Sequence, residues 1–196
     1  MTRRTRPTRA LRPLHLFICE DTKSSKFYME GLGKAQNINI KAESSYGTSP
    51  ENVLRSAKEK LSMFQDEGTA TVYCLFDKDD CDDSKFNNVI AECKRKGIVP
   101  AISVPCYEYW LLLHLKKTNQ PFNDAQECCE AFRAEYNRAF HTNYNVKQLK
   151  SRKEIFTDLK DRLDIAIKNA ENLELKADET PYTNMHEVIK KIIHDT

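Results

Sequence analysis

Acidic side chains gather directly after an apolar run in the segment VYCLFDKDDCDD, residues 72–83. Asp77 ends the run, Asp79 follows two positions later, and Asp80, Asp82 and Asp83 come behind them. If the strand conformation continues past Asp77, its side chain and that of Asp79 point the same way. Carboxylate oxygens are ligands that suit Mg²⁺ or Mn²⁺, so Asp77, Asp79 and Asp80 are candidate metal ligands. Asp82 and Asp83 are expected instead to cap the helix that follows.

Short apolar or alternating runs predict four strands, at residues 14–20, 37–44, 70–76 and 98–104. Helical patterns lie between these strands, at residues 24–35, 49–64 and 84–97. In the first of these patterns, Gly31 and Gly33 are expected to break the helix. Strands that alternate with helices predict an α/β fold, in which helices sandwich a parallel sheet.

In such a sheet, ligands bind beyond the carboxyl ends of the strands. Glu20 ends the first predicted strand and Asp77 ends the third, so both acids should emerge at that edge. Together with Asp79 they would repel one another unless a cation lay between them. The residues therefore predict a divalent metal centre at the sheet edge, with Glu20 among its ligands.

The pattern changes after Tyr107. Residues 107–115 are apolar enough for either a helix or a strand, residues 123–139 and 151–173 predict helices, and Thr183 is the expected cap of a final helix. We expect a single structural unit with three parts, namely a basic disordered tail at 1–13, an α/β core at 14–115 and a helical extension packed on it at 116–196.

Composition argues against a secreted protein, a membrane protein and a zinc site. The chain has 31 Lys and Arg against 29 Asp and Glu, so net charge points to no partner, although five arginines crowd its first twelve residues. It has neither a secretory apolar segment nor a run of roughly 20 apolar residues, so we expect a cytoplasmic protein and no membrane contact. None of the seven cysteines forms a Cys-x-x-Cys pair, which argues against a zinc site.

Other acidic motifs fit less well. An EF-hand loop that began at Asp77 would need Gly and Glu where Asp82 and Asn88 stand. A phosphotransfer motif of the DxDx[TV] type closes a first strand, and here Cys81 takes the place of its Thr or Val. A phospho-receiver domain fits Glu20 and Asp77 better, but it also needs a lysine that ends a later strand.

A glutamate on the first strand and an Asp-x-Asp on the third resemble the Toprim domain. The block SVPCYEYWLLLHL at 103–115 further resembles the SNPCFELWLLLHF block of the RloB family, which is linked to restriction loci and abortive infection. FICEDTKSSKFYMEGL, FDKDD, AIKNAENL and PYTNMHEVIKKI resemble other blocks of that family, so the likeness spans about residues 14–193. The chain departs from the family pattern at Asp21, Ser24, Ser25, Val104, Tyr107 and Tyr109.

The resemblance implies a Toprim-like, Mg²⁺- or Mn²⁺-dependent nuclease for DNA or RNA, including tRNA, that acts in phage defence beside an ATPase encoded nearby. By motif matching, Glu20 would be the general acid/base, Asp77 and Asp79 metal ligands, and Glu108 a further acid near the metal. Glu108 would be costly to bury without a metal or a basic partner.

Several roles stay open at this stage. His114 is either a catalytic residue or a satisfied core histidine. Lys23 and Lys26 either meet substrate phosphate or are solvated, and Lys150 with its basic neighbours fits a solvated helix face or a nucleic-acid groove. Self-association also stays open. The alternative function is a non-catalytic module that binds nucleic acid or regulates the ATPase.

Overall fold

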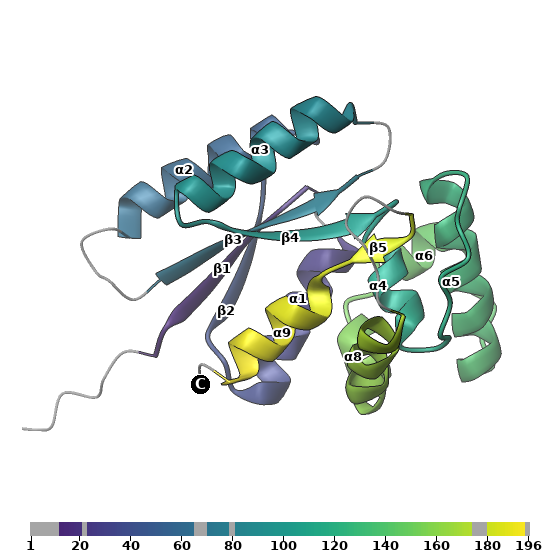
Figure 1. Ribbon diagram of the computed structural model, residues 1–196. Helices are drawn as coiled ribbons and strands as arrows, with labels where there is room; N and C mark the ends of the chain where they lie inside the picture. Colours follow the sequence, from purple (N-terminus) through teal and green to yellow (C-terminus); the bar gives the residue numbers. More distant parts are fainter. Residues whose placement is uncertain (1–11, 21–22, 65–69, 79–80, 174–179, 195–196) are drawn as a thin grey trace, which may run out of the picture.

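A five-stranded sheet forms the centre of the computed structural model, which describes residues 12–20, 23–64, 70–78, 81–173 and 180–194 (Figure 1). The strands are β1 (Leu14–Cys19), β2 (Ile40–Ser44), β3 (Ala70–Asp77), β4 (Val99–Val104) and β5 (Tyr182–Thr183). Their order is β2-β1-β3-β4-β5, and only the β4–β5 pair is antiparallel. The α/β fold class with a mostly parallel sheet is confirmed, as are the four strands that the sequence predicted.

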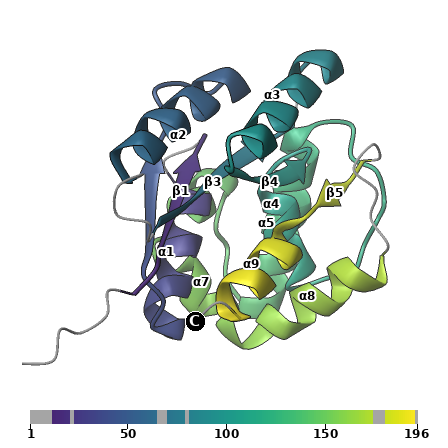
Figure 2. The ribbon, with the colours of Figure 1, turned by 60° about the vertical axis from the view of Figure 1, so that its left-hand side comes forward.

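Helices cover both faces of the sheet because its strands are apolar on both sides. On one face, α2 (Pro50–Phe64) and α3 (Asp83–Arg95) pack against Leu16, Val72 and their neighbours on β1 and β3. On the other face, α1 (Ser24–Gln36) and α9 (Met185–His194) pack against the alternate residues, such as Phe17 and Tyr73 (Figures 1 and 2). This alternation follows from the two-residue period of a strand.

A group of helices continues the second face. They are α4 (Glu108–Leu113), α5 (Ala125–Phe140), α6 (Val146–Lys150), α7 (Ile155–Leu159), a 3₁₀ turn (Lys160–Arg162) and α8 (Leu163–Asn172). The apolar segment at 107–115, which could have been a helix or a strand, forms helix α4. The single helix expected at 151–173 is in fact two helices, α7 and α8, joined by the 3₁₀ turn. Buried Leu159, Leu163 and Ala166 keep helical spacing across the turn, so the sequence pattern does not reveal it.

Two glycines expected to break α1 lie inside it instead. A Cβ added to Gly31 would lie 2.6 Å from the Cβ of Phe156, and one added to Gly33 would lie 2.9 Å from the Cβ of Ile40. Both glycines therefore let neighbouring elements approach α1 closely, and the prediction of a helix break was wrong.

The segment after residue 115 also contributes to the sheet. β5 pairs with the end of β4, and α9 follows immediately. Thr183 acts near the start of α9 as expected, because its hydroxyl accepts the backbone N–H of Met185 at 3.2 Å. The three-part division of the chain stays a prediction, with the addition that its last part returns a strand to the core.

The arginine-rich tail lies almost wholly outside the described residues. The exception is Arg12, whose guanidinium donates to the backbone and side-chain oxygens of Asn37 at 2.8 and 2.6 Å. Among the described helices, none combines the length and the apolar character that crossing a bilayer requires.

Candidate metal and catalytic centre

Glu20 and Asp77 lie side by side at the carboxyl edge of the sheet. β1 and β3 are neighbours, and their register pairs Cys19 with Leu75, so Glu20 follows one strand beside the end of the other. The Glu20 carboxylate accepts the backbone N–H of Asp77 at a long 3.4 Å. Both residues are half-buried, which leaves part of each open to solvent. The expected meeting of the two acids is present, whereas Asp79 and Asp80 lie outside the described residues.

Glu108 is the third acid, and it enters from the next strand. It begins α4 just after β4, and its side chain is almost fully buried. Its Oε1 accepts the hydroxyl of Ser24 at 2.9 Å and lies 3.5 Å from the Nζ of Lys150. The basic partner that a buried carboxylate needs is therefore Lys150, and a polar hydrogen bond completes its surroundings.

Lys150 connects Glu108 to the strand edge. Burial lowers the pKa of Lys150, but the negative charges around it, among them Glu108 and Asp77, outweigh burial and raise the pKa above its ordinary value. Lys150 thus lies within electrostatic reach of both acids and is positively charged there. The sequence analysis did not pair Lys150 with Glu108, because a lysine in a basic segment has the same pattern as a solvated one.

His114 lies in the core rather than in an open site. Its side chain is fully buried, Nε2 lies 2.8 Å from the hydroxyl of Tyr28, and Nδ1 lies 3.1 Å from the carbonyl oxygen of Trp110. Burial lowers the pKa of His114 to about 4, although backbone hydrogen bonds act in the opposite direction. A neutral ring with both nitrogens bonded packs and orients its neighbours, so we do not keep His114 among the catalytic residues.

Lys23 and Lys26 lie on either side of Ser24, whose hydroxyl donates to Glu108. Lys23 is exposed just before α1, and half-buried Lys26 lies in its first turn, 4.0 Å from Glu30. Ser24 between them reaches Glu108, so the two lysines lie on the element that borders the acids. Their predicted contact with substrate phosphate stays a prediction.

The later acids of the segment have structural partners. The Asp82 carboxylate accepts the backbone N–H of Lys85 at 3.0 Å and caps α3. Asp83 pairs with Lys78 at 2.6 Å in the first turn of the same helix. The expected capping role is confirmed for Asp82, whereas Asp83 lies in the first turn of α3, where an acid is favoured by the positive end of the helix.

Two thiols lie beside Glu108. The sulfurs of Cys106 and Cys129 are 3.9 Å apart, and they form with Glu108 a group of three potential ligand atoms within 4.8 Å of one another. Hydrogen bonding to Cys128 together with burial raises the pKa of Cys106, and hydrogen bonding to Cys106 together with burial raises that of Cys129. Protonated sulfurs do not suit a hard cation, so this group does not fit Mg²⁺.

The donor set at the strand edge fits a hard cation better. Glu20 and Asp77 present only carboxylate oxygens from two adjacent strands, and Asp79 follows two positions later in the sequence. Mg²⁺ and Mn²⁺ bind such carboxylates together with water and substrate phosphate. The arrangement can hold a divalent ion near the ion pair that Lys150 forms with Glu108.

Comparison with known proteins gives one family. A family model described as RloB-like protein matches residues 15–192, which is most of the chain. No curated protein and no solved structure matches.

Proposed function

This chain belongs to the RloB-like family, and on that premise we propose that it is a Mg²⁺- or Mn²⁺-dependent nuclease of phage defence that cleaves phosphodiester bonds in DNA or RNA. The observation that supports this proposal most is the pairing of Glu20 and Asp77 at the ends of adjacent strands. Two half-buried acidic side chains at neighbouring strand ends repel one another unless a proton or a cation offsets their charges.

In this proposal Asp77, Asp79 and Glu20 hold the ion, which when bound supplies Lewis-acid polarisation of the scissile phosphate. Asp77 lies at the end of central strand β3, where pairing with β4 holds its backbone in place. Sites built on regular elements position ligands more accurately than sites on loops.

Glu20 would move the proton of the reaction. Its carboxylate follows the end of β1, beside the end of β3, and accepts the backbone N–H of Asp77 at 3.4 Å, which places it next to the candidate metal ligand. A positioned carboxyl group in this role contributes about 10²- to 10⁴-fold to a rate.

Glu108 and Lys150 would act as a positioning pair. Lys150 neutralises the buried Glu108 and adds a positive charge near Asp77, where the charge of a phosphate develops during cleavage. Lys23 and Lys26, on either side of Ser24, would meet neighbouring phosphates of the substrate.

The second candidate function is a non-catalytic module that binds nucleic acid or regulates an ATPase partner. One observation favours it. Glu108 already has Ser24 and Lys150 as partners, so the most buried acid of the group is satisfied without a metal.

The test uses the full chain with Mg²⁺ or Mn²⁺ and labelled DNA and RNA, including tRNA, alone and with the ATPase encoded beside it. The variants are Glu20→Gln and Asp77→Asn, and the matched control is Asp164→Asn, which changes an exposed acid of α8. We expect metal-dependent cleavage that falls at least about 100-fold in both site variants and not in the control.

Metal binding is measured separately from cleavage. Titration with Mn²⁺, followed by the loss of the free-ion electron paramagnetic resonance signal, should show a site that weakens in Asp77→Asn. Mn²⁺ affinity and cleavage that are the same in wild type and in both variants would exclude the catalytic role. Nucleic-acid binding without cleavage, even with the ATPase present, would favour the second candidate.

A further inference from the structure

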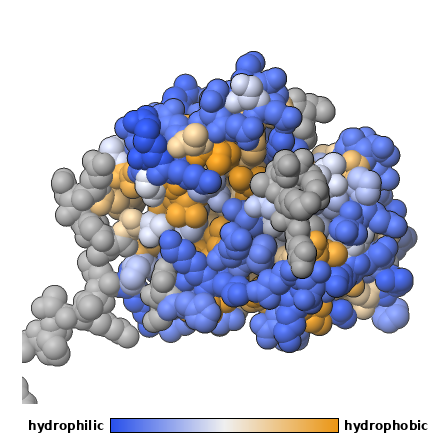
Figure 3. All heavy atoms as spheres, in the orientation of Figure 1, coloured by the Kyte–Doolittle hydropathy of each residue, from blue (hydrophilic) through white to orange (hydrophobic). Residues whose placement is uncertain are grey.

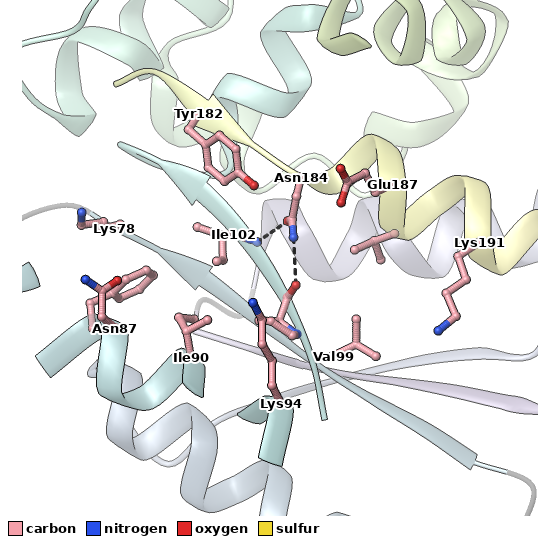
Figure 4. A pocket seen from close by; sticks show the side chains of 13 residues that line it. Lys78, Asn87, Ile90, Lys94, Val99, Ile102, Tyr182, Asn184, Glu187 and Lys191 are labelled. Atoms are coloured by element: carbon pink, nitrogen blue, oxygen red, sulfur yellow. Dashed lines mark hydrogen bonds between the residues drawn. The ribbon is translucent and has the colours of Figure 1, made fainter. Parts of the chain in front are cut away.

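A groove leads away from the candidate centre along the outer side of β4, where the helix layers of the two faces of the sheet meet. It lies between α3 and α9 over β4 and has a volume of about 490 Å³ (Figure 4). Lys78, the residue directly after Asp77, lines one end of it. We call it the α3–α9 groove, and its position makes it continuous with the acidic edge.

The floor of this groove is apolar and partly open to solvent. Ile90, Val99 and Ile102 line it and are only half-buried. Figure 3 shows apolar side chains at the surface between the α2–α3 layer and α9. The outer part of β4 lies between α3 of one helix layer and α9 of the other, and these half-buried residues lie there (Figure 1).

Lysines line the groove at separate places. Figure 4 shows Lys78 at one end, Lys94 near the middle and Lys191 at the other end. Lys78 is held by Asp83, whereas Lys94 and Lys191 are exposed and have no ion pair among the described residues. A single phosphate needs clustered cations, and cations spread along an apolar groove suit a chain that carries phosphates at intervals.

An added β-strand cannot occupy the groove through the open side of β4. The side-chain amide of Asn184 accepts the backbone N–H of Ile102 at 2.7 Å and donates to the carbonyl of Pro100 at 3.0 Å (Figure 4). The backbone N–H of Asn184 donates to the carbonyl of Ile102 at 3.2 Å. These groups of β4 are therefore already bonded, and an occupant must bind through its own charged and flat apolar groups.

We propose that the α3–α9 groove holds a single strand of nucleic acid, with phosphates at Lys78, Lys94 and Lys191 and bases against the apolar floor. This inference rests on the proposed nuclease function and names the form of its substrate and the path by which the strand reaches Asp77. A duplex would hide its bases and could not use the floor.

A second basic groove provides the comparison. It lies between α1 and α7, and exposed Lys34 and Lys160 line it. Two acids, Glu30 and Glu154, stand among its lysines. Glu187 also lines the α3–α9 groove, so charge alone does not separate the two grooves. Their positions do, because the second groove borders α1, whereas Lys78 connects the α3–α9 groove to the end of β3.

The test measures binding of fluorescently labelled 20-nucleotide single strands and of the matching duplex by anisotropy, over a range of salt concentrations. EDTA is present, so binding does not depend on the metal centre. The test variant is Lys94→Gln with Lys191→Gln, and the matched control is Lys34→Gln with Lys160→Gln. All four lysines are exposed, and circular dichroism is to be used to check that both variants fold.

For single strands, the slope of log affinity against log salt changes by about 0.7 for each phosphate contact. Loss of two contacts should therefore reduce the slope by about 1.4 and weaken binding about 25-fold at 0.1 M salt. We expect this loss in the test variant only, and tighter binding of the single strand than of the duplex.

Three results would overturn the inference: an equal loss in the control, tighter binding of the duplex, or no binding of either form by the wild type. If the groove instead binds an acidic segment of a protein, the wild type would bind neither the single strand nor the duplex. The nuclease proposal can fail without this one. A protein that binds single strands as expected but cleaves no nucleic acid would still use this groove as a binding site.

Discussion

Acidification should destabilise this protein through His114, and the size of the effect can be worked out from its surroundings. The ring is fully buried and its pKa is lowered to about 4, chiefly by burial. In the unfolded chain the pKa of histidine is about 6.5. Between these values the unfolded chain binds a proton that the folded protein does not, so the free energy of unfolding falls as pH falls from 6.5 towards 4.

The full loss is about 3 kcal/mol, at about 1.4 kcal/mol for each pH unit between the two values. Linkage gives about 2 kcal/mol of this loss between pH 7.5 and pH 5, a range in which the carboxylates are still mostly ionised. Lowering the pH also acts through His186, because burial lowers its pKa as well. The prediction therefore concerns the difference between wild type and a His114→Gln variant, in which the amide can still bond Tyr28.

The assay is urea unfolding at pH 7.5, 6 and 5, followed by circular dichroism and by the fluorescence of Trp110, the sole tryptophan. Its ring centroid lies 5.0 Å from that of His114, so it reports on this part of the core. We expect wild type to lose about 2 kcal/mol more than His114→Gln between pH 7.5 and pH 5. The control is His141→Asn, an exposed position in left-handed conformation that asparagine tolerates. Equal pH dependence in wild type and His114→Gln would refute the buried neutral histidine and reopen its catalytic role.

Four further substitutions test contacts described above. Gly31→Ala should lower the free energy of unfolding by about 1 kcal/mol in urea titrations, because the contact with Phe156 outweighs the gain in helix propensity; a stabilised variant would contradict the close approach. Lys150→Met should lower it by about 2 kcal/mol, less than the usual cost of breaking a buried pair because the lysine is one-third exposed. Adding Glu108→Gln to Lys150→Met should recover most of the lost free energy of unfolding. If the effects of the two substitutions on that free energy simply add, the two residues do not interact. Asn184→Ala should speed amide hydrogen exchange at Ile102, and unchanged exchange would disprove its role at β4.

The sequence predicted the fold well where strands are apolar and long. β1, β3 and β4 begin and end within a residue or two of the predicted bounds, because fully buried strands read as continuous apolar runs. β5 was missed because two residues, Tyr182 and Thr183, are too few to show a period. The predicted helix break at Gly31 was wrong because glycine occurs both where helices break and where helices pack closely.

The candidate site was predictable where it depends on strand ends. Glu20 and Asp77 follow from the rule that parallel strands end at one edge, and β1 and β3 prove to be neighbours. Lys150 and Ser24 were not predictable as partners of Glu108, because they come from helices that lie far apart in the sequence. His114 shows the limit of motif matching, since a shared residue can serve packing.

The dependence of β4 on Asn184 has a consequence for the order of folding. Asn184 lies 82 positions after Ile102, the residue that it bonds, and β5 and α9 come with it. During synthesis the N-terminal parts of a protein are available first, so β1 to β4 can assemble while the partner of β4 is still being made. In that interval the outer side of β4 is open to pairing with other chains. A nascent chain that stalls between α5 and β5 is therefore expected to aggregate, and release of the segment that contains Asn184 ends this vulnerable period.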